Sequence, residues 1–237
     1  MQLYRPLSHA LAPGCERTSW YELDRDNTQL ILHRAGVTLQ PDEHPTVIDT
    51  WKEMEKLVDT GKVKSIGVSN FSIKILSQLL PHCKIIPAIN QVEMHPCLPQ
   101  TGLKSFCEER GILLTAYSPL GRPPVTTNTA TTIPILLAEP ALLTIAEKHS
   151  VAPAQVLVNW AVQRHTIVVP KSEDEGRMKA NITLVKLDDE DMNALDTLHE
   201  RPEMHRSLLS YHGTGGVVFG WTYESMGWDM KPGGIVA

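Results

Sequence analysis

The stretch that decides the fold covers residues 61–121 and reads GKVKSIGVSNFSIKILSQLLPHCKIIPAINQVEMHPCLPQTGLKSFCEERGILLTAYSPLG. It contains three β-like runs, at residues 64–68, 85–94 and 112–117, and segments of helical character alternate with them. Each run ends in polar residues. This alternation predicts an α/β fold with a parallel sheet and crossover helices, whose chemistry lies at the carboxyl ends of the strands.

Length and charge limit the protein class. The chain has 237 residues, close to the roughly 250 residues of one barrel domain, so we expect a single domain over residues 1–237. A net charge of -5 gives no positive surface for nucleic acid or an anionic membrane. The sequence has no run of about 18 apolar residues and no recognisable secretory or transit segment. We therefore expect a cytoplasmic protein with neither nucleic acid nor membrane as a partner.

The cysteines give no sign of a metal centre. The four cysteines form no CxxC pair and show no His/Cys ligand spacing. We expect reduced thiols, no disulfide framework and no bound metal.

Three regions are expected along the chain. Residues 1–22 contain prolines and a glycine without any sustained period, which predicts irregular structure. Residues 28–200 carry the alternating units, beginning with a strand candidate at residues 28–32 that ends at His33. Residues 201–237 form a Gly-rich carboxyl-terminal tail.

Helix boundaries carry clear signals in the alternating region. Thr46 opens a helix with TVID, a form of the capping box in which Asp49 takes the place of Glu, and Gly61 ends this helix. Its inward face is predicted to hold Val47, Trp51, Met54 and Val58. Further helices are expected at residues 72–80, 140–149 and 153–164, and around Leu103, Phe106 and Cys107. Two more are expected to open with Glu173, Asp174 and Glu175 and to follow a cap at Asp188. A strand is expected at 166–169 and a long loop at 122–134.

The chain resembles the aldo-keto reductase family over residues 33–198. The resemblance rests on ILH, DTWKEMEKLVDTGKVKSIGVSNF, INQVEMHP, LLTAYSPLG and VVPKSEDEGRMKANI, which occur in that order. The tail segments HRSLLSYH and VFGWTYESMGWDM are similar to those of fungal members. The resemblance implies a (β/α)8 TIM barrel that binds a nicotinamide cofactor, usually NADP(H), at the carboxyl ends of its strands.

The resemblance also implies which residues hold NADP(H). Ser69, Asn70 and Gln91 match positions that hydrogen-bond the nicotinamide carboxamide, which needs both donors and acceptors. Tyr117 matches the aromatic residue that stacks under the nicotinamide ring. The remaining matches are Ser118 and Leu120 along the pyrophosphate, Lys171, Ser172 and Arg177 at the adenosine 2′-phosphate, and Asn181 at the adenine. A cation pair beside a helix amino terminus suits a dianionic phosphate.

Each of these residues also has a purely structural interpretation. A strand end followed by a helix start accounts for Ser69 and Asn70, a buried amide for Gln91, a core aromatic for Tyr117, and solvated charge for Lys171 and Arg177. The joint occurrence of all the motifs favours descent from the family over these separate explanations. Descent alone does not establish activity.

The catalytic groups of the family are matched only at His33. Members reduce a carbonyl with a Tyr that protonates the oxygen, a Lys and an Asp that tune this Tyr, and a His that orients the substrate. A βαβ unit takes about 30 residues or more, so we expect that about the first three βα units are missing, together with the catalytic Tyr, Lys and Asp. Tyr4 and Tyr21 are the only tyrosines before His33, and neither stands in a matching context. Arg34 stands where the family commonly has Trp.

The sequence therefore predicts a partial (β/α)8 TIM barrel lacking about its first three βα units. The leading functional hypothesis is an NADP(H)-dependent oxidoreductase that reduces aldehydes or ketones to alcohols, with a small-molecule carbonyl substrate as its partner. Loss of a positioned general acid costs typically about 10²- to 10⁴-fold in rate, so a slow reductase is expected. The alternatives are a catalytically inactive nucleotide-binding pseudoenzyme or interaction protein, and a proton transfer by His33 without hydride.

Overall fold

The computed structural model describes residues 39–121, 136–212, 215–218 and 220–237. The irregular segment predicted at residues 1–22, the strand predicted at 28–32 and the loop predicted at 122–134 lie outside the described residues. His33 and Arg34 lie outside them as well.

A parallel sheet forms the centre of the described chain. Its strands are β1 (Val68–Ser69), β2 (Ile89–Glu93), β3 (Leu113–Tyr117) and β4 (Ile167–Val168), and they pair in the order β1-β2-β3-β4. Every neighbouring pair is parallel, and helical segments connect successive strands. This is the arrangement expected for part of a (β/α)8 barrel.

The strand bounds differ from those predicted. The first run was expected at residues 64–68, but Lys64 and Ser65 are exposed and precede the paired residues Val68 and Ser69. The prediction at 166–169 was also too long, because only Ile167 and Val168 pair with β3. Both β1 and β4 pair with one described neighbour each, so their extent is set by tertiary contacts that the sequence pattern does not contain.

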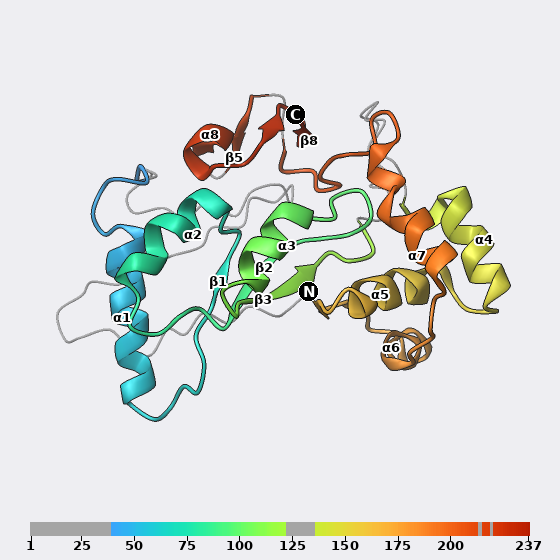
Figure 1. The fold of residues 1–237 in the computed structure, drawn as a ribbon, viewed down its shortest axis with the longest axis horizontal. Helices are drawn as coiled ribbons and strands as arrows, with labels where there is room; N and C mark the ends of the chain where they lie inside the picture. The colour runs from blue at the N-terminus through green and yellow to red at the C-terminus, as the bar shows by residue number, and fades with distance from the viewer. Residues whose placement is uncertain (1–38, 122–135, 213–214, 219) are drawn as a thin grey trace.

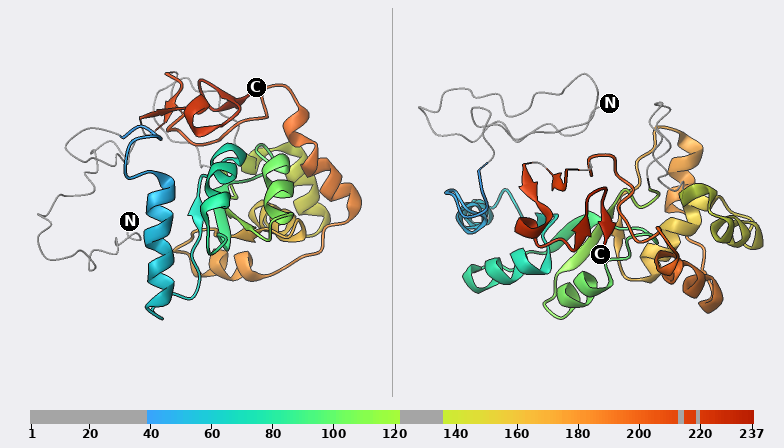
Figure 2. Two further views of the ribbon diagram at one scale, coloured as in Figure 1. Left: turned by 60° about the vertical axis from the view of Figure 1, so that its left-hand side comes forward. Right: turned by 90° about the horizontal axis from the view of Figure 1, so that it is seen from above.

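Helices cover one face of this sheet. Figures 1 and 2 show α2 and α3 side by side on that face. The helices are α1 (Val47–Asp59), α2 (Ile73–Leu79), α3 (Thr101–Glu108), α4 (Pro140–Lys148), α5 (Pro153–Gln163), α6 (Glu175–Ile182) and α7 (Asp189–Asp196), with short 3₁₀ turns at Leu80–His82, Leu136–Ala138 and Leu198–Glu200. Most predicted helices are confirmed to within two residues at each end.

Alternation along the strands separates the two faces of the sheet. Val92, Leu114 and Ala116 are buried in one core cluster with Trp160 of α5. Leu113, one residue before Leu114, is 51% exposed, and so belongs to the opposite face. The core therefore lies between the sheet and the helices.

The amino terminus of α1 confirms the predicted capping box. The Thr46 hydroxyl accepts a hydrogen bond from the Asp49 amide at 3.2 Å, and the Asp49 carboxylate accepts one from the Thr46 amide at 2.9 Å. Trp51 of the predicted inward face is buried and donates from Nε1 to the carbonyl of Ile85 at 3.1 Å. Ile48, which the sequence pattern did not include, also packs in the cluster around Trp51.

The carboxyl-terminal tail adds two small antiparallel ribbons. They consist of β5 (Val217–Val218) with β6 (Trp221–Thr222) and β7 (Met230–Lys231) with β8 (Ile235–Val236), and α8 (Tyr223–Met226) lies between them. In Figure 1 these elements run across the top of α2 and α3. The Ser72 hydroxyl donates to the carbonyl of Met226 at 2.6 Å, and the Lys74 ammonium donates to the carbonyl of Glu224 at 2.9 Å. The tail is thus attached to the start of α2.

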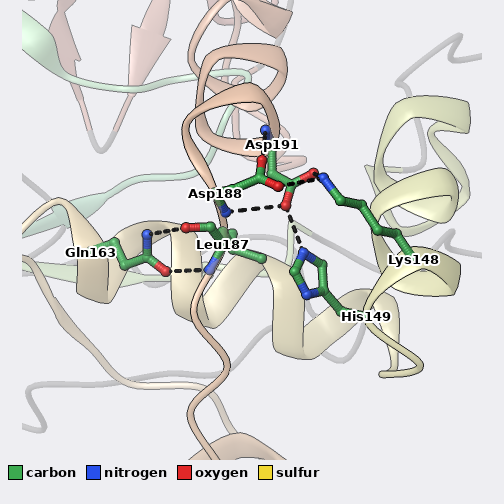
Figure 3. Close-up of polar contacts among 6 residues, drawn as sticks. All are labelled: Lys148, His149, Gln163, Leu187, Asp188 and Asp191. Carbon is green, nitrogen blue, oxygen red and sulfur yellow. Dashed lines mark hydrogen bonds and ion pairs between the residues drawn. The ribbon is translucent and has the colours of Figure 1, made fainter.

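A polar cluster joins α4, α5 and α7 (Figure 3). The Lys148 ammonium contacts Asp188 at 2.6 Å and Asp191 at 2.8 Å, and the ring of His149 contacts the second oxygen of Asp191 at 2.6 Å. Gln163 donates to the carbonyl of Leu187 and accepts from its amide. Burial raises the pKa of the Asp191 carboxyl, but hydrogen bonds from Lys148 and His149 outweigh it and hold this pKa below its ordinary value.

Within the residues that the structure describes, no helix has the length and apolar character needed to cross a membrane.

Replacing Thr46 by Ala should lower the free energy of unfolding by about 1 kcal/mol, because the Asp49 amide loses its capping acceptor. Urea unfolding measures the change. Thr50→Ala is the matched control. The Thr50 hydroxyl donates to a carbonyl one turn back and caps no amide in the described part of the chain, so its loss should change stability little. Equal losses in the two variants would contradict the capping role.

Replacing Asp191 by Asn should cost about 2 kcal/mol of stability at neutral pH, because the buried acceptors for Lys148 and His149 are weakened. In the unaltered chain, the pKa of Asp191 is lower in the folded state than in the unfolded state. The stability that Asp191 contributes is therefore fully present above its unfolded pKa of about 3.9 and is lost as the pH falls through its folded pKa. Urea unfolding across this range should show a smaller pH dependence in Asp191→Asn. The exposed neighbour Asp189→Asn is the control and should retain the pH dependence of the unaltered chain.

Candidate active site

Four of the predicted cofactor residues meet at the carboxyl ends of β1, β2 and β3. The Ser69 hydroxyl and the Asn70 amide both donate to the main-chain carbonyl of Gln91 at 2.9 Å. The Tyr117 hydroxyl donates to the side-chain oxygen of Asn70, also at 2.9 Å. Because the strands are parallel, their ends place these polar groups at one edge of the sheet.

Asn70 owes its position to an unusual backbone conformation. Its φ of 61° lies in the left-handed region, which Asn tolerates better than most residues. This turn directs the Asn70 side chain to Tyr117, whose hydroxyl donates to the Asn70 side-chain oxygen. The main chain of the next residue, Phe71, is held by the buried Asn90 side chain, which accepts from the Phe71 amide and donates to the Phe71 carbonyl. The Asn70 amide group is therefore fixed beside the Tyr117 hydroxyl.

Tyr117 is held as a neutral phenol. Burial raises its pKa to about 12, although the hydrogen bond to Tyr211 opposes this change. The two hydroxyls lie 3.0 Å apart. At neutral pH Tyr117 keeps its proton and can donate it in a hydrogen bond to Asn70.

Gln91 lies on the sheet face that points away from the helices, because its neighbour Val92 packs into the helical core. Its side chain is half-buried. Thr115 is paired with Gln91 in register, and its hydroxyl is buried without a hydrogen-bond partner in the described part of the chain. Thr115 was not predicted from the sequence, since a single Thr in an apolar strand gives no distinguishing signal.

The predicted pyrophosphate residues follow β3 directly. Ser118 has a φ of 47°, and its carbonyl accepts from the Gly121 amide at 2.9 Å, which makes a tight turn. Leu120 packs against the main core cluster. The turn thus presents backbone groups while Leu120 anchors it.

The predicted 2′-phosphate and adenine residues lie apart from these, after β4 and on α6. The Lys171 ammonium pairs with Glu173 at 2.6 Å, and both side chains are 71% exposed. Arg177 is exposed beside Asp174, and Asn181 is half-buried in the last turn of α6. Among the described residues, no hydrogen bond or ion pair joins this group to Ser69, Asn70, Gln91 or Tyr117.

The start of α6 corrects one prediction. The helix was expected to open with Glu173, but it begins at Glu175, and Asp174 is the N-cap that accepts from the Arg177 amide at 2.8 Å. Ser172 accepts from the Asp174 amide at 3.1 Å, which forms the turn before the cap. Glu173 therefore stays outside the helix, where it pairs with Lys171.

A buried carboxylate missed by the sequence analysis lies at the end of β2. Glu93 is 4% exposed, and it accepts hydrogen bonds from the Ser207 hydroxyl at 2.5 Å and from the Leu208 amide at 2.8 Å. Its oxygen also lies 2.9 Å from Nε2 of His95. An ionisable residue in a strand, two positions before a His, was the available signal in INQVEMHP.

A cavity of about 450 Å³ adjoins this edge of the sheet. Asn70 and Tyr117 line it, together with the first turn of α3 and tail residues that include Tyr211 and Trp228. This volume lies within the range of roughly 300–1,000 Å³ typical of small-molecule sites. In the described ranges, no three His, Cys, Asp or Glu side chains gather in a way that could hold a metal ion.

The residues present fit the two ends of a nicotinamide dinucleotide. Asn70 offers an amide beside the Tyr117 hydroxyl, and the half-buried Gln91 offers a second amide on the neighbouring strand β2, and a carboxamide requires such donors and acceptors. Lys171 and Arg177 offer two exposed cations near the start of α6. Their carboxylate partners are also exposed, and such surface pairs are weak enough for a phosphate to compete for the cations.

Comparison with known proteins identifies the family. The model of the "Aldo/keto reductase family" matches residues 17–200. D-galacturonate reductase of Hypocrea jecorina is 44% identical over 191 residues, which cover 73% of this chain and 59% of that protein. Glycerol 2-dehydrogenase (NADP(+)) of Saccharomyces cerevisiae is 46% identical over 153 residues, covering 64% of this chain and 46% of that protein.

A solved structure supports the same assignment. Aldose reductase from Giardia lamblia superposes with a TM-score of 0.60 at 37% identity, covering 67% of this chain and 52% of that chain. The chain thus spans between 46% and 59% of the length of these three relatives. The predicted fold class, a partial (β/α)8 barrel, is confirmed. By sequence and by structure, the chain belongs to the aldo/keto reductase family.

Proposed function

We propose that this protein binds NADP(H) and reduces an aldehyde or ketone to an alcohol. The observation that carries the proposal is the meeting of Ser69, Asn70, Gln91 and Tyr117 at one edge of the sheet. The family membership supports it, and one relative is named as an NADP(+) enzyme. When bound, the reduced cofactor supplies the hydride.

The described residues would bind and orient the two reactants. Asn70 and Gln91 would hold the carboxamide, and the Tyr117 ring would lie against one face of the nicotinamide. Lys171 and Arg177 would bind the 2′-phosphate, and Asn181 the adenine. We propose the cavity beside Asn70 and Tyr117 as the place of the carbonyl substrate, because Tyr117 forms part of its wall and tail residues complete it.

One observation favours the alternative of nucleotide binding without turnover. The three tyrosines in the described part of the chain, Tyr117, Tyr211 and Tyr223, all have a pKa raised by burial. A general acid works best when its pKa lies near the operating pH, so none of these phenols is tuned for that role. His33, which lies outside the described residues, is the candidate that the family resemblance names for a group that orients or protonates the substrate.

The double variant Lys171→Ala with Arg177→Ala should bind NADPH at least about ten-fold more weakly, because two charge-assisted contacts to the 2′-phosphate are lost. NADH lacks this phosphate, so its affinity should change little. Cofactor fluorescence titration measures both affinities. Lys179→Ala, an exposed cation on the same helix, is the control. An equal loss for NADH, or in the control, would refute the assignment of the phosphate site.

Turnover should be detected as slow NADPH oxidation with a reactive short aldehyde, and His33→Gln should reduce it by about 10²-fold or more while NADPH binding is kept. Absorbance of NADPH gives the rate. His165→Gln, an exposed histidine, serves as the control. Cofactor binding without turnover above background would support the non-catalytic alternative, and absence of cofactor binding would contradict both.

A further inference from the structure

Glu93 connects the sheet to a distant part of the chain. One of its oxygens accepts from the Ser207 hydroxyl, and the other accepts from the Leu208 amide. The Ser207 hydroxyl in turn accepts from the Leu209 amide at 3.1 Å. A single carboxylate therefore fixes three consecutive tail residues that lie more than one hundred positions away in the sequence.

This anchored segment leads directly to the site. Glu93 of β2 is paired in register with Tyr117 of β3, the residue proposed to contact the nicotinamide. The two residues are therefore direct neighbours across the sheet. Only a few residues after Leu208, the hydroxyl of Tyr211 reaches within 3.0 Å of the Tyr117 hydroxyl. The tail also supplies Tyr211, His212, Trp228 and Met230 to the wall of the cavity.

The tail makes further hydrogen bonds besides those to Glu93. The Arg206 amide donates to the Cys97 carbonyl, which lies outside the tail, and the Ser207 amide donates to the Gly234 carbonyl, which lies within it. The Ser72 hydroxyl fixes the tail near Met226. These bonds end in main-chain carbonyls, whereas Glu93 provides a charged acceptor, whose hydrogen bonds are roughly twice as strong as neutral ones.

We propose that Glu93 is a positioning residue, which sets the tail against Tyr117 and thereby the shape of the cavity proposed for the carbonyl substrate. This inference rests on the proposed function in naming the cavity's occupant, but the anchoring itself does not. Glu93 also lines the cavity, but the role proposed for it is exerted through its hydrogen bonds to Ser207 and Leu208.

Glu93→Gln tests the anchoring, because Gln keeps the shape of the side chain and removes its charge. Hydrogen exchange of the Leu208 and Leu209 amides should accelerate by roughly ten-fold. The bond from the Leu208 amide to residue 93 loses its charged acceptor, and the bond from the Leu209 amide to the Ser207 hydroxyl weakens because Glu93 no longer holds this hydroxyl as firmly. Amides of α5 should keep the exchange rates of the unaltered chain. In fluorine NMR of protein labelled with fluorotryptophan, the Trp228 resonance should shift while that of Trp160 stays in place.

Glu55→Gln is the matched control. Glu55 is also a buried carboxylate that accepts two main-chain amides, those of Lys84 and Ile85, but it lies on α1 and has no described contact with the tail. This variant should accelerate exchange at residues 84 and 85 and leave the tail and Trp228 unchanged. Unchanged tail exchange in Glu93→Gln would overturn the proposal, and so would an equal acceleration in α5, which indicates general destabilisation.

Kinetics separate this proposal from the proposed function. Glu93→Gln should raise the KM for a short aldehyde by roughly ten-fold, with kcat and NADPH affinity changed less than about two-fold, because the cavity wall and not the cofactor contacts are displaced. A change confined to kcat would overturn the positioning role. If the unaltered chain shows no turnover, the proposed function fails, and the exchange and fluorine measurements still decide whether Glu93 positions the cavity wall.

Discussion

The parallel ladder between β2 and β3 is the contact on which the rest of the sheet depends. It runs from Ile89 paired with Leu113 to Glu93 paired with Tyr117, whereas β1 and β4 add only two pairs each at its sides. A shift of β3 by one residue against β2 would turn Tyr117 toward the helices and bring an apolar neighbour to the site. Main-chain hydrogen bonds thus determine which polar groups meet at the edge of the sheet.

The sequence predicted those features that depend on short-range patterns. The capping box at Thr46 and the cap at Asp188 form as expected, because both need residues only three positions apart. The polar ends of consecutive strands also meet as expected, since parallel strands end at one edge. The exact extent of β1 was not predictable, because it depends on which residues of β2 remain available for pairing.

The features that the sequence did not reveal arise from distant contacts. Glu93 stands in a motif that reads as a strand end, and nothing local indicates Ser207 as its partner. The pairing of Lys171 with Glu173 has a related cause. Asp is a better N-cap than Glu, so α6 starts after Asp174, and Glu173 lies before the first turn of the helix. Which of two neighbouring acidic residues becomes the N-cap is difficult to predict from their order in the sequence alone.

Gly227 carries a consequence for how this tail can vary. Its φ is 66°, and a Cβ there would lie 2.6 Å from the Lys74 Cβ and 2.8 Å from the Ser72 hydroxyl oxygen. Any other residue would therefore collide with α2 just where the tail crosses it. Glycine is thus the residue that this crossing of the tail over α2 requires. The path of the tail over α2 therefore depends on the missing side chain of Gly227 as well as on the hydrogen bonds from Ser72 and Lys74.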